Sequence, residues 1–246
     1  MDDRAARADV TTAREFGKIH AKFSGDKNVN PILRRIVTAL TTAALVVVAI
    51  LKVPAPWLRP ACLALAMLAG LELALLLKRK IREERAKTVG AAILFGFLIA
   101  MTFSALPLIA AHHGNVMLLY VIAIVKISDM GGFAFGVGAF KLRGKTRKLC
   151  PSISPNKSWE GLFGSVFASC VVSCVFIPAT AFPLPKALAF GVAAAFVGTL
   201  GDLIESKLKR WVGVKDSATF MPAGLGGFLD MFDSLLLAPT LLLPFI

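Results

Sequence analysis

Seven apolar segments dominate the sequence and restrict what the chain can fold into. They fall at roughly 33–51, 57–77, 89–111, 116–140, 161–182, 187–206 and 230–246. A helix needs about 20 apolar residues to cross a bilayer, and most of these segments reach or approach that length. The chain is 57% hydrophobic and only 17% charged, whereas soluble domains are about 45–50% apolar and about 25% charged. We therefore predict an all-α, polytopic membrane protein with about seven transmembrane helices.

Lysine and arginine are concentrated in alternate connections between these segments. The connections 52–60, 112–115 and 178–186 contain few of them, whereas 141–160 and 207–229 contain many. Because positive charges are retained on the cytoplasmic side, we expect both long loops and the N-terminus there. The same pattern accounts for the net charge of +13, so we expect no nucleic acid partner. A bacterial inner membrane is the expected location.

The charge pattern also separates a polar tail from the membrane domain. Residues 1–30 are polar with mixed charges, and we expect them to form a cytoplasmic N-terminal tail. Residues 31–246 would form a single integral-membrane domain, with its functional site on the long cytoplasmic loops.

Two pairs of carboxylates flank a glycine-rich turn near the C-terminus. Asp202 and Glu205 form one i, i+3 pair, and Asp230 and Asp233 form the other. On a helix this spacing places both members of a pair on one face. Four cations and a bare backbone turn lie between the pairs: Lys207, Lys209, Arg210, Lys215 and Pro222-Ala-Gly-Leu-Gly-Gly227. Carboxylates for Mg²⁺, cations for phosphate and an unobstructed turn are what a phosphoryl-transfer site needs.

Polar residues elsewhere add further candidates. Asp129 interrupts the segment 116–140, and an ionisable residue inside a membrane segment is a functional candidate. Glu72 is a second such carboxylate, close to a basic loop. Lys157 and Ser158 come just before an expected helix, where free backbone N–H groups favour an anion. The alternative for the loop 141–160 is a basic cytoplasmic loop without a binding role.

Three motifs in order resemble those of phosphatidate cytidylyltransferases (CDP-diacylglycerol synthases). They are Ser128-Asp129 with its glycines, Ser154-Pro-Asn-Lys-Ser-Trp-Glu-Gly161, and the stretch from Ser206-Lys-Leu-Lys-Arg210 through Lys215-Asp216 and Pro222 to Gly226-Gly227-Phe-Leu-Asp230 and Asp233. The resemblance covers roughly 33–246. It implies transfer of a cytidylyl group from CTP to phosphatidic acid, which gives CDP-diacylglycerol and pyrophosphate.

The resemblance and the charges together suggest a role for each candidate. Asp202 and Asp230 would be the principal ligands of Mg²⁺, alone or with a second cation, and Glu205 and Asp233 secondary ligands. Asp129 would organise the site. The triphosphate, the pyrophosphate and the lipid phosphate would be bound by Ser154, Lys157, Ser158, Lys209, Arg210, Lys215, Asp216, Gly226 and Gly227. The bilayer is an expected partner, and a homodimer is one expected assembly.

The chain departs from the family pattern at two positions. Leu225 stands where a histidine is usual, and Met231 stands where an arginine commonly follows the first aspartate. Two alternative functions remain open. One is a related CTP-dependent enzyme that acts on a polyprenyl or isoprenoid lipid. The other is a cation-coupled transporter, although the chain has no internal repeat of the kind that many transporters show.

Overall fold

The computed structural model describes residues 44, 46–214 and 227–246. Its contacts divide the chain into two units, 1–48 and 49–246. In the first unit the described residues 44 and 46–48 are helical, and the predicted tail 1–30 lies outside the described residues. Every element named below belongs to the second unit.

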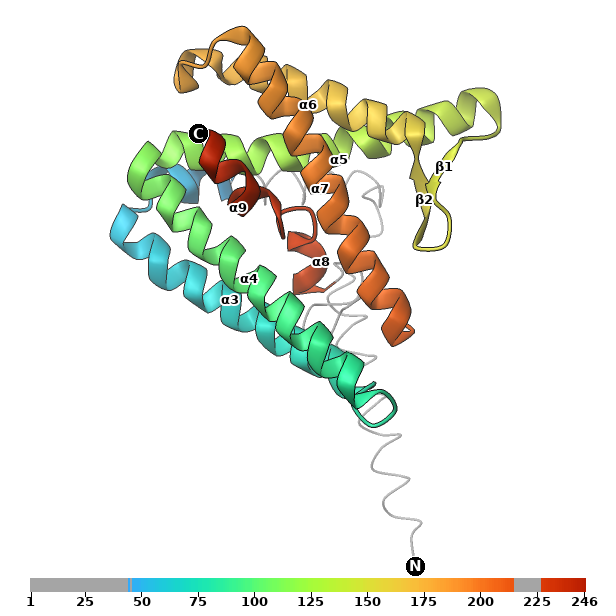
Figure 1. Ribbon diagram of the computed structural model, residues 1–246. Coiled ribbons are helices and arrows are strands. Elements are labelled where there is room, and N and C mark those ends of the chain that lie inside the picture. Colours follow the sequence, from blue (N-terminus) through green and yellow to red (C-terminus); the bar gives the residue numbers. More distant parts are fainter. Residues whose placement is uncertain (1–43, 45, 215–226) are drawn as a thin grey trace, which may run out of the picture. The chain divides into compact units, whose positions relative to one another are not determined.

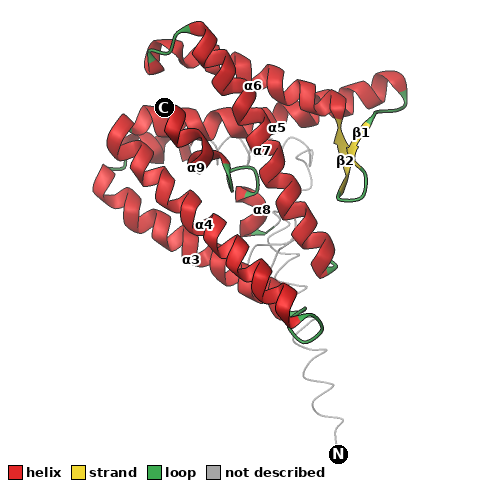
Figure 2. Cartoon of the chain, in the orientation of Figure 1, coloured by secondary structure: helices red, strands yellow, loops and turns green. Residues whose placement is uncertain are grey.

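Five long helices form most of the second unit (Figures 1 and 2). They are α3 (Ala55–Lys78), α4 (Arg85–His113), α5 (Asn115–Arg143), α6 (Trp159–Thr180) and α7 (Leu184–Val212). All five are long and apolar enough to cross a membrane. The predicted segments from 57–77 to 187–206 are thus confirmed as helices, and the chain is an integral membrane protein.

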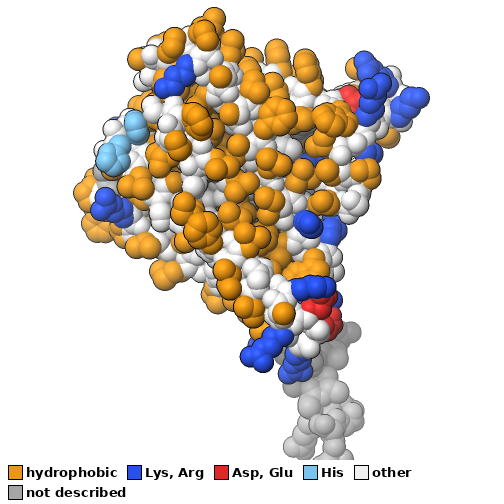
Figure 3. Space-filling model, in the orientation of Figure 1, with side chains coloured by type: hydrophobic (Ala, Val, Ile, Leu, Met, Phe, Trp, Pro, Cys, Tyr) orange, Lys and Arg blue, Asp and Glu red, His pale blue; other side chains and the backbone are white. Residues whose placement is uncertain are grey.

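The space-filling view agrees with this class (Figure 3). Hydrophobic side chains cover most of the face shown, whereas Lys and Arg side chains gather at its margins. Large apolar residues such as Phe97 and Phe133 are 60% and 75% exposed. A soluble protein rarely exposes so much contiguous apolar surface, whereas a bilayer covers it.

Helix α7 continues beyond the predicted segment 187–206 because its polar end consists of good helix formers. The basic residues Lys207, Lys209 and Arg210, predicted to begin a loop, lie on the last turns of α7. Cations near a helix C-terminus are favourable because they face its negative dipole end. Gly213 then ends the helix with a left-handed φ of 83°, and its N–H donates to the carbonyl of Arg210.

The last predicted segment, 230–246, is not one continuous helix. It consists of α8 (Phe228–Phe232), a turn, α9 (Ala238–Leu242) and a final 3₁₀ turn, Leu243–Phe245. Side chains from other helices satisfy the carbonyl groups that this break leaves: Thr102 donates to the Leu236 oxygen at 2.6 Å. Among the described residues, five helices are long and apolar enough to cross the membrane. Most of the first predicted segment, 33–51, lies outside the described residues, so the count of seven stays a prediction.

A short hairpin corrects the all-α prediction. Strands β1 (Lys148–Cys150) and β2 (Ser154–Ser158) pair antiparallel, with Lys148 opposite Ser158. They occupy the loop between α5 and α6. The hairpin leads directly into α6, because the Ser158 side chain accepts a hydrogen bond from the Gly161 N–H and caps that helix.

Glycines allow α5 and α6 to pack closely along their length (Figure 1). A Cβ atom on Gly164 would overlap the Phe135 side chain and would lie 2.6 Å from the Gly131 carbonyl oxygen. A Cβ on Gly161 would lie 2.9 Å from the Gly132 carbonyl oxygen. Small residues at such positions let helix backbones approach within a membrane. This contact places Asp129 and the hairpin close to each other.

We expect Gly164→Ala to destabilise the protein because overpacking a tight contact costs about 1–3 kcal/mol. Thermal unfolding of the purified protein in detergent should show a lower midpoint. Gly96→Ala is the matched control, since a Cβ at Gly96 meets no described atom within 4 Å. Equal midpoints for the two variants would contradict the proposed packing constraint.

Candidate active site

Three of the four predicted carboxylates near the C-terminus meet in space. One oxygen from each of Asp202, Glu205 and Asp233 lies within 4.8 Å of the others. The i, i+3 spacing on α7 presents Asp202 and Glu205 to the same side. Asp233 approaches them from the residue that ends α8. We call these three side chains the acidic cluster.

Asp230, the fourth carboxylate, lies beside the cluster and pairs with a lysine. The Lys209 ammonium is 2.6 Å from a Glu205 oxygen and 3.0 Å from an Asp230 oxygen. The Gly227 N–H also donates to Asp230 at 2.8 Å. Burial alone would raise the pKa of Asp230, but this N–H and the Lys209 charge lower it to about 2. Asp230 therefore remains ionised and joins α7 to the start of α8.

Lys126 is a member of the site that the sequence analysis missed. Its ammonium donates to the Met231 carbonyl at 2.7 Å and to the Ser234 hydroxyl at 2.9 Å, and it lies 3.8 Å from Asp233. Lys126 thus supplies positive charge beside Met231, where the sequence lacks the usual arginine. The signal was available, because a lysine in the middle of an apolar segment is as unusual as Asp129.

Asp233 experiences both burial and neighbouring charge. Burial raises the pKa of Asp233 to about 6, the negative charge of Asp202 adds to this effect, and Lys126 opposes it. A positive ion among the three carboxylates would favour their ionised forms, because repulsion between like charges is severe in a low dielectric.

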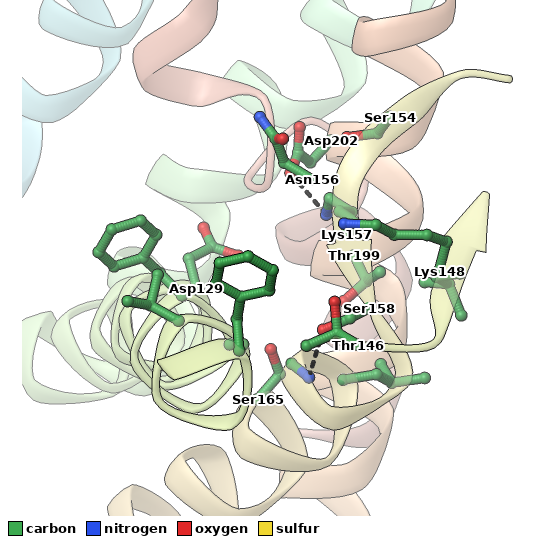
Figure 4. Close-up of a pocket in the computed structure, with 18 residues that line it drawn as sticks. Asp129, Thr146, Lys148, Ser154, Asn156, Lys157, Ser158, Ser165, Thr199 and Asp202 are labelled. Atoms are coloured by element: carbon green, nitrogen blue, oxygen red, sulfur yellow. Dashed lines mark hydrogen bonds and ion pairs between the residues drawn. The ribbon is translucent and has the colours of Figure 1, made fainter. Parts of the chain in front are cut away.

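A pocket of about 540 Å³ opens next to the cluster (Figure 4). Residues of α5, the hairpin, α6 and α7 line it. Lys157 extends from β2 toward Asp202 on α7, with 2.5 Å between the ammonium and a carboxylate oxygen. Asp129 enters from α5. The pocket and the acidic cluster therefore share Asp202.

The pocket combines polar and apolar walls. Ser154 and Ser158 line it as the sequence predicted them to line a site, and Phe133 and Val137 contribute apolar surface. Polar lining residues that sequence reasoning did not single out are Thr146, Lys148, Asn156, Ser165 and Thr199. Lys148 belongs to the basic run of the loop, and Asn156 lies in the quoted motif 154–161 without an assigned role; Thr146, Ser165 and Thr199 have no spacing pattern that marks them.

Other predicted site residues have different positions. Arg210 is exposed on α7. Lys215, Asp216, Leu225 and Gly226 lie outside the described residues. Glu72 is buried on α3 and accepts the Leu229 N–H at 2.6 Å. This contact holds the first turn of α8 and gives Glu72 a structural role.

The fold and the site together define a class: a helical integral membrane protein with a partly buried acidic cluster beside a pocket that contains lysines. The family model described as "Cytidylyltransferase family" matches residues 8–246. The chain belongs to that family.

Named relatives match about half of the chain. The chain is 42% identical over 127 residues to a phosphatidate cytidylyltransferase of Staphylococcus aureus (strain COL). The match covers 51% of this chain and 46% of that relative. The chain is 42% identical over 130 residues to the protein of that name from Haemophilus influenzae, 50% and 43% of the two lengths. The chain is 39% identical over 127 residues to the phosphatidate cytidylyltransferase of Bacillus subtilis (strain 168). The match covers 51% of this chain and 45% of that relative. The matched part thus spans less than half of each relative.

We expect Lys209→Met to destabilise the fold strongly. Glu205 has no exposed surface, and removing one partner of a buried ion pair costs about 3–5 kcal/mol because a charge is left uncompensated. Thermal unfolding in detergent measures the effect, and adding Glu205→Gln should recover part of it. Lys207→Met is the control, since Lys207 is exposed on the same helix. If Lys209→Met lowers the unfolding midpoint no more than Lys207→Met does, the Lys209–Glu205 ion pair does not support the fold.

Proposed function

We propose that this protein transfers a cytidylyl group from CTP to phosphatidic acid, giving CDP-diacylglycerol and pyrophosphate. The main observation is the Lys157–Asp202 ion pair, which joins a lysine-containing pocket to a cluster of carboxylates. Membership of the cytidylyltransferase family supports nucleotidyl transfer. The relatives named phosphatidate cytidylyltransferase support a lipid phosphate as acceptor.

The acidic cluster fits a magnesium ion. Asp202, Glu205 and Asp233 offer three oxygens close together, and oxygen is the ligand that Mg²⁺ prefers. Glu205 Oε1 is buried and accepts no hydrogen bond from any described residue, so a cation would satisfy it. A bound Mg²⁺ would neutralise phosphate charge and orient the triphosphate. Asp230 as a principal ligand remains a prediction; its present partners suggest that it positions Lys209.

The reaction needs positioning and charge neutralisation more than proton transfer. An oxygen of the lipid phosphate, already anionic at neutral pH, attacks the α-phosphorus of CTP. A new P–O bond forms there, while the bond from the α-phosphorus to the oxygen that bridges it to the β-phosphorus breaks. Pyrophosphate leaves with that oxygen and its electron pair. Catalysis of such in-line transfer comes from alignment and from cations near the phosphate oxygens.

The lysines of the site would provide these cations. Lys157 pairs with Asp202; we propose that it moves to a phosphate oxygen when CTP binds, which frees Asp202 for the metal. Lys148 lines the same pocket and would add a second positive charge. Lys209 would stabilise the leaving pyrophosphate, as the sequence predicted together with Arg210 and Lys215.

The site would lie at the cytoplasmic edge of a bacterial inner membrane. The positive-inside distribution of Lys and Arg supports this orientation, and CTP, a soluble nucleotide, would reach the site from that side. Phosphatidic acid would enter from the bilayer. A homodimer and a second cation remain predictions.

We expect Asp202→Asn to reduce the formation of CDP-diacylglycerol by about 10²-fold or more, the range seen when charge stabilisation is removed from an active site. The assay follows labelled CTP with phosphatidic acid and a titration of Mg²⁺. Glu83→Gln is the control, since Glu83 is 63% exposed and lies outside the site. Full turnover by a folded Asp202→Asn protein would contradict the proposed metal site.

The same assay separates the proposed function from its alternatives. Phosphatidic acid and a polyprenol or polyprenyl phosphate are offered as competing acceptors. Product from the isoprenoid lipid alone would indicate the related enzyme, and no metal-dependent release of pyrophosphate from CTP would indicate a non-enzymatic role.

Lys126→Met should lower kcat by about tenfold or more, because hydrogen bonds to charged groups contribute about 1.5–3 kcal/mol. We expect Lys126 to act as a positioning residue, through the orientation of Asp233 and the turn after α8. Lys126→Arg should restore part of kcat while the KM for phosphatidic acid changes little. The exposed neighbour Ile127→Met is the control. Unchanged kcat in Lys126→Met would contradict this role.

A further inference from the structure

A second hollow of about 710 Å³ lies against the same two helices as the pocket described above. It uses a different face of each. On α5, Gly132, Phe133 and Gly136 line the first pocket, whereas Ala134, Phe135 and Gly138 line the hollow. The two spaces share no lining residue. The hollow is therefore separate from the proposed active site, and we call it the α5–α6 groove.

Apolar side chains form most of this groove and face outward. Leu142 is 88% exposed, Phe163 is 65% exposed and Trp159 is 56% exposed. Phe135 is less exposed, at 41%, and contacts Phe163, with 6.3 Å between the ring centroids. Such an exposed surface with a tryptophan at its edge is typical of the interface between lipid chains and headgroups.

Two arginines lie at one end of the apolar surface. Arg143 ends α5, and Arg147 precedes β1. Hydrogen bonds hold both the N–H and the carbonyl of the Arg147 backbone. The N–H donates to both Glu160 oxygens at 3.2 Å, and the carbonyl accepts the Trp159 N–H at 3.0 Å. Neither guanidinium group forms an ion pair with another described residue. Figure 3 shows Lys and Arg gathered beside hydrophobic side chains at the end of the molecule that has the hairpin.

We propose that the α5–α6 groove binds an anionic phospholipid as an accessory site. The headgroup phosphate would lie between Arg143 and Arg147, since guanidinium groups match phosphate geometry. An acyl chain would lie along Leu142, Phe135 and Phe163. Basic pockets between membrane helices on the cytoplasmic side suit such headgroups. The groove differs from general lipid contact because it combines two arginines, one of them on a hydrogen-bonded backbone, with a hollow.

A second copy of the chain is the other candidate occupant. Ala134 and Gly138 have the four-residue spacing that favours helix packing, and a Cβ on Gly138 would meet no described atom. The charges argue against it, however. Two guanidinium groups and one carboxylate leave the groove positive, and Glu160 already accepts a backbone N–H. A two-fold contact would bring these positive groups together, whereas an anionic lipid neutralises them.

Fluorescence quenching tests the proposal without an activity assay, so its result is independent of the proposed function. The chain has three tryptophans, and the Trp57→Phe/Trp211→Phe protein retains only Trp159. It is reconstituted in phosphatidylcholine vesicles that contain an equal minor fraction of either brominated phosphatidylglycerol or brominated phosphatidylcholine. We expect phosphatidylglycerol to quench Trp159 about threefold more strongly, since each arginine near a surface attracts anionic lipid.

Two variants and one control complete the test. Arg143→Gln/Arg147→Gln should abolish the preference for phosphatidylglycerol, and Lys141→Gln/Lys145→Gln, with the same charge change in exposed residues outside the groove, should retain most of it. Gly138→Leu fills the groove without changing charge and should also abolish the preference.

Three results would overturn the proposal. The first is equal quenching by the two brominated lipids in the parent protein. The second is an equal loss of preference in the two glutamine variants, which would indicate surface charge alone. The third is protection of Trp159 from both lipids together with cross-linking of Leu142→Cys between two copies, which would assign the groove to a second chain.

Discussion

Three closely spaced carboxylates, one buried and two partly buried, are the constraint on which the rest of this structure depends. Placing Asp202, Glu205 and Asp233 within 4.8 Å of one another is unfavourable in a low-dielectric interior unless positive charge lies close by. Three lysines provide it from three different elements: Lys126 from α5, Lys157 from β2 and Lys209 from α7. The charges therefore join parts of the chain that are far apart in sequence. They also hold the elements in the arrangement that forms the pocket.

The irregular segment after α7 is the second consequence of this constraint. A continuous membrane helix would satisfy its own backbone groups, whereas the break between α8 and α9 leaves carbonyls that need donors. Lys126 and Thr102 provide donors at Met231 and Leu236, and Glu72 accepts the Leu229 N–H. Polar side chains on the long helices, with Glu72 and Thr102 buried and Lys126 partly exposed, thus support non-helical backbone at the site. This explains why Glu72 and Lys126 are tolerated within apolar segments.

The α5–α6 pair gives the protein two different surfaces. Close glycine contacts, such as that of Gly164 with Phe135, hold the helices together. One face then borders the pocket that contains Asp129 and Lys157, and the other borders the α5–α6 groove with its arginines. A nucleotide-dependent reaction on a lipid needs access for a soluble and a membrane-bound substrate. Hairpin residues line the pocket, whereas Arg147 and Trp159, which flank the hairpin, line the groove.

The sequence by itself determined the class, the five long helices and the identity of the acidic residues. Apolar runs of about 20 residues have few stable alternatives to a membrane helix, and i, i+3 spacing places Asp202 and Glu205 together on any helix. The leucines of 230–246 predicted one segment, although Asp230, Asp233 and the helix-breaking Pro239 and Pro244 were signals of a break. The sequence did not indicate β1 and β2 or the role of Lys126. Only the tertiary structure decided that Asp233 joins Asp202 and Glu205 while Asp230 pairs with Lys209. The reason is physical: those partners depend on hydrogen bonds and charges supplied by distant helices, which local periodicity cannot encode.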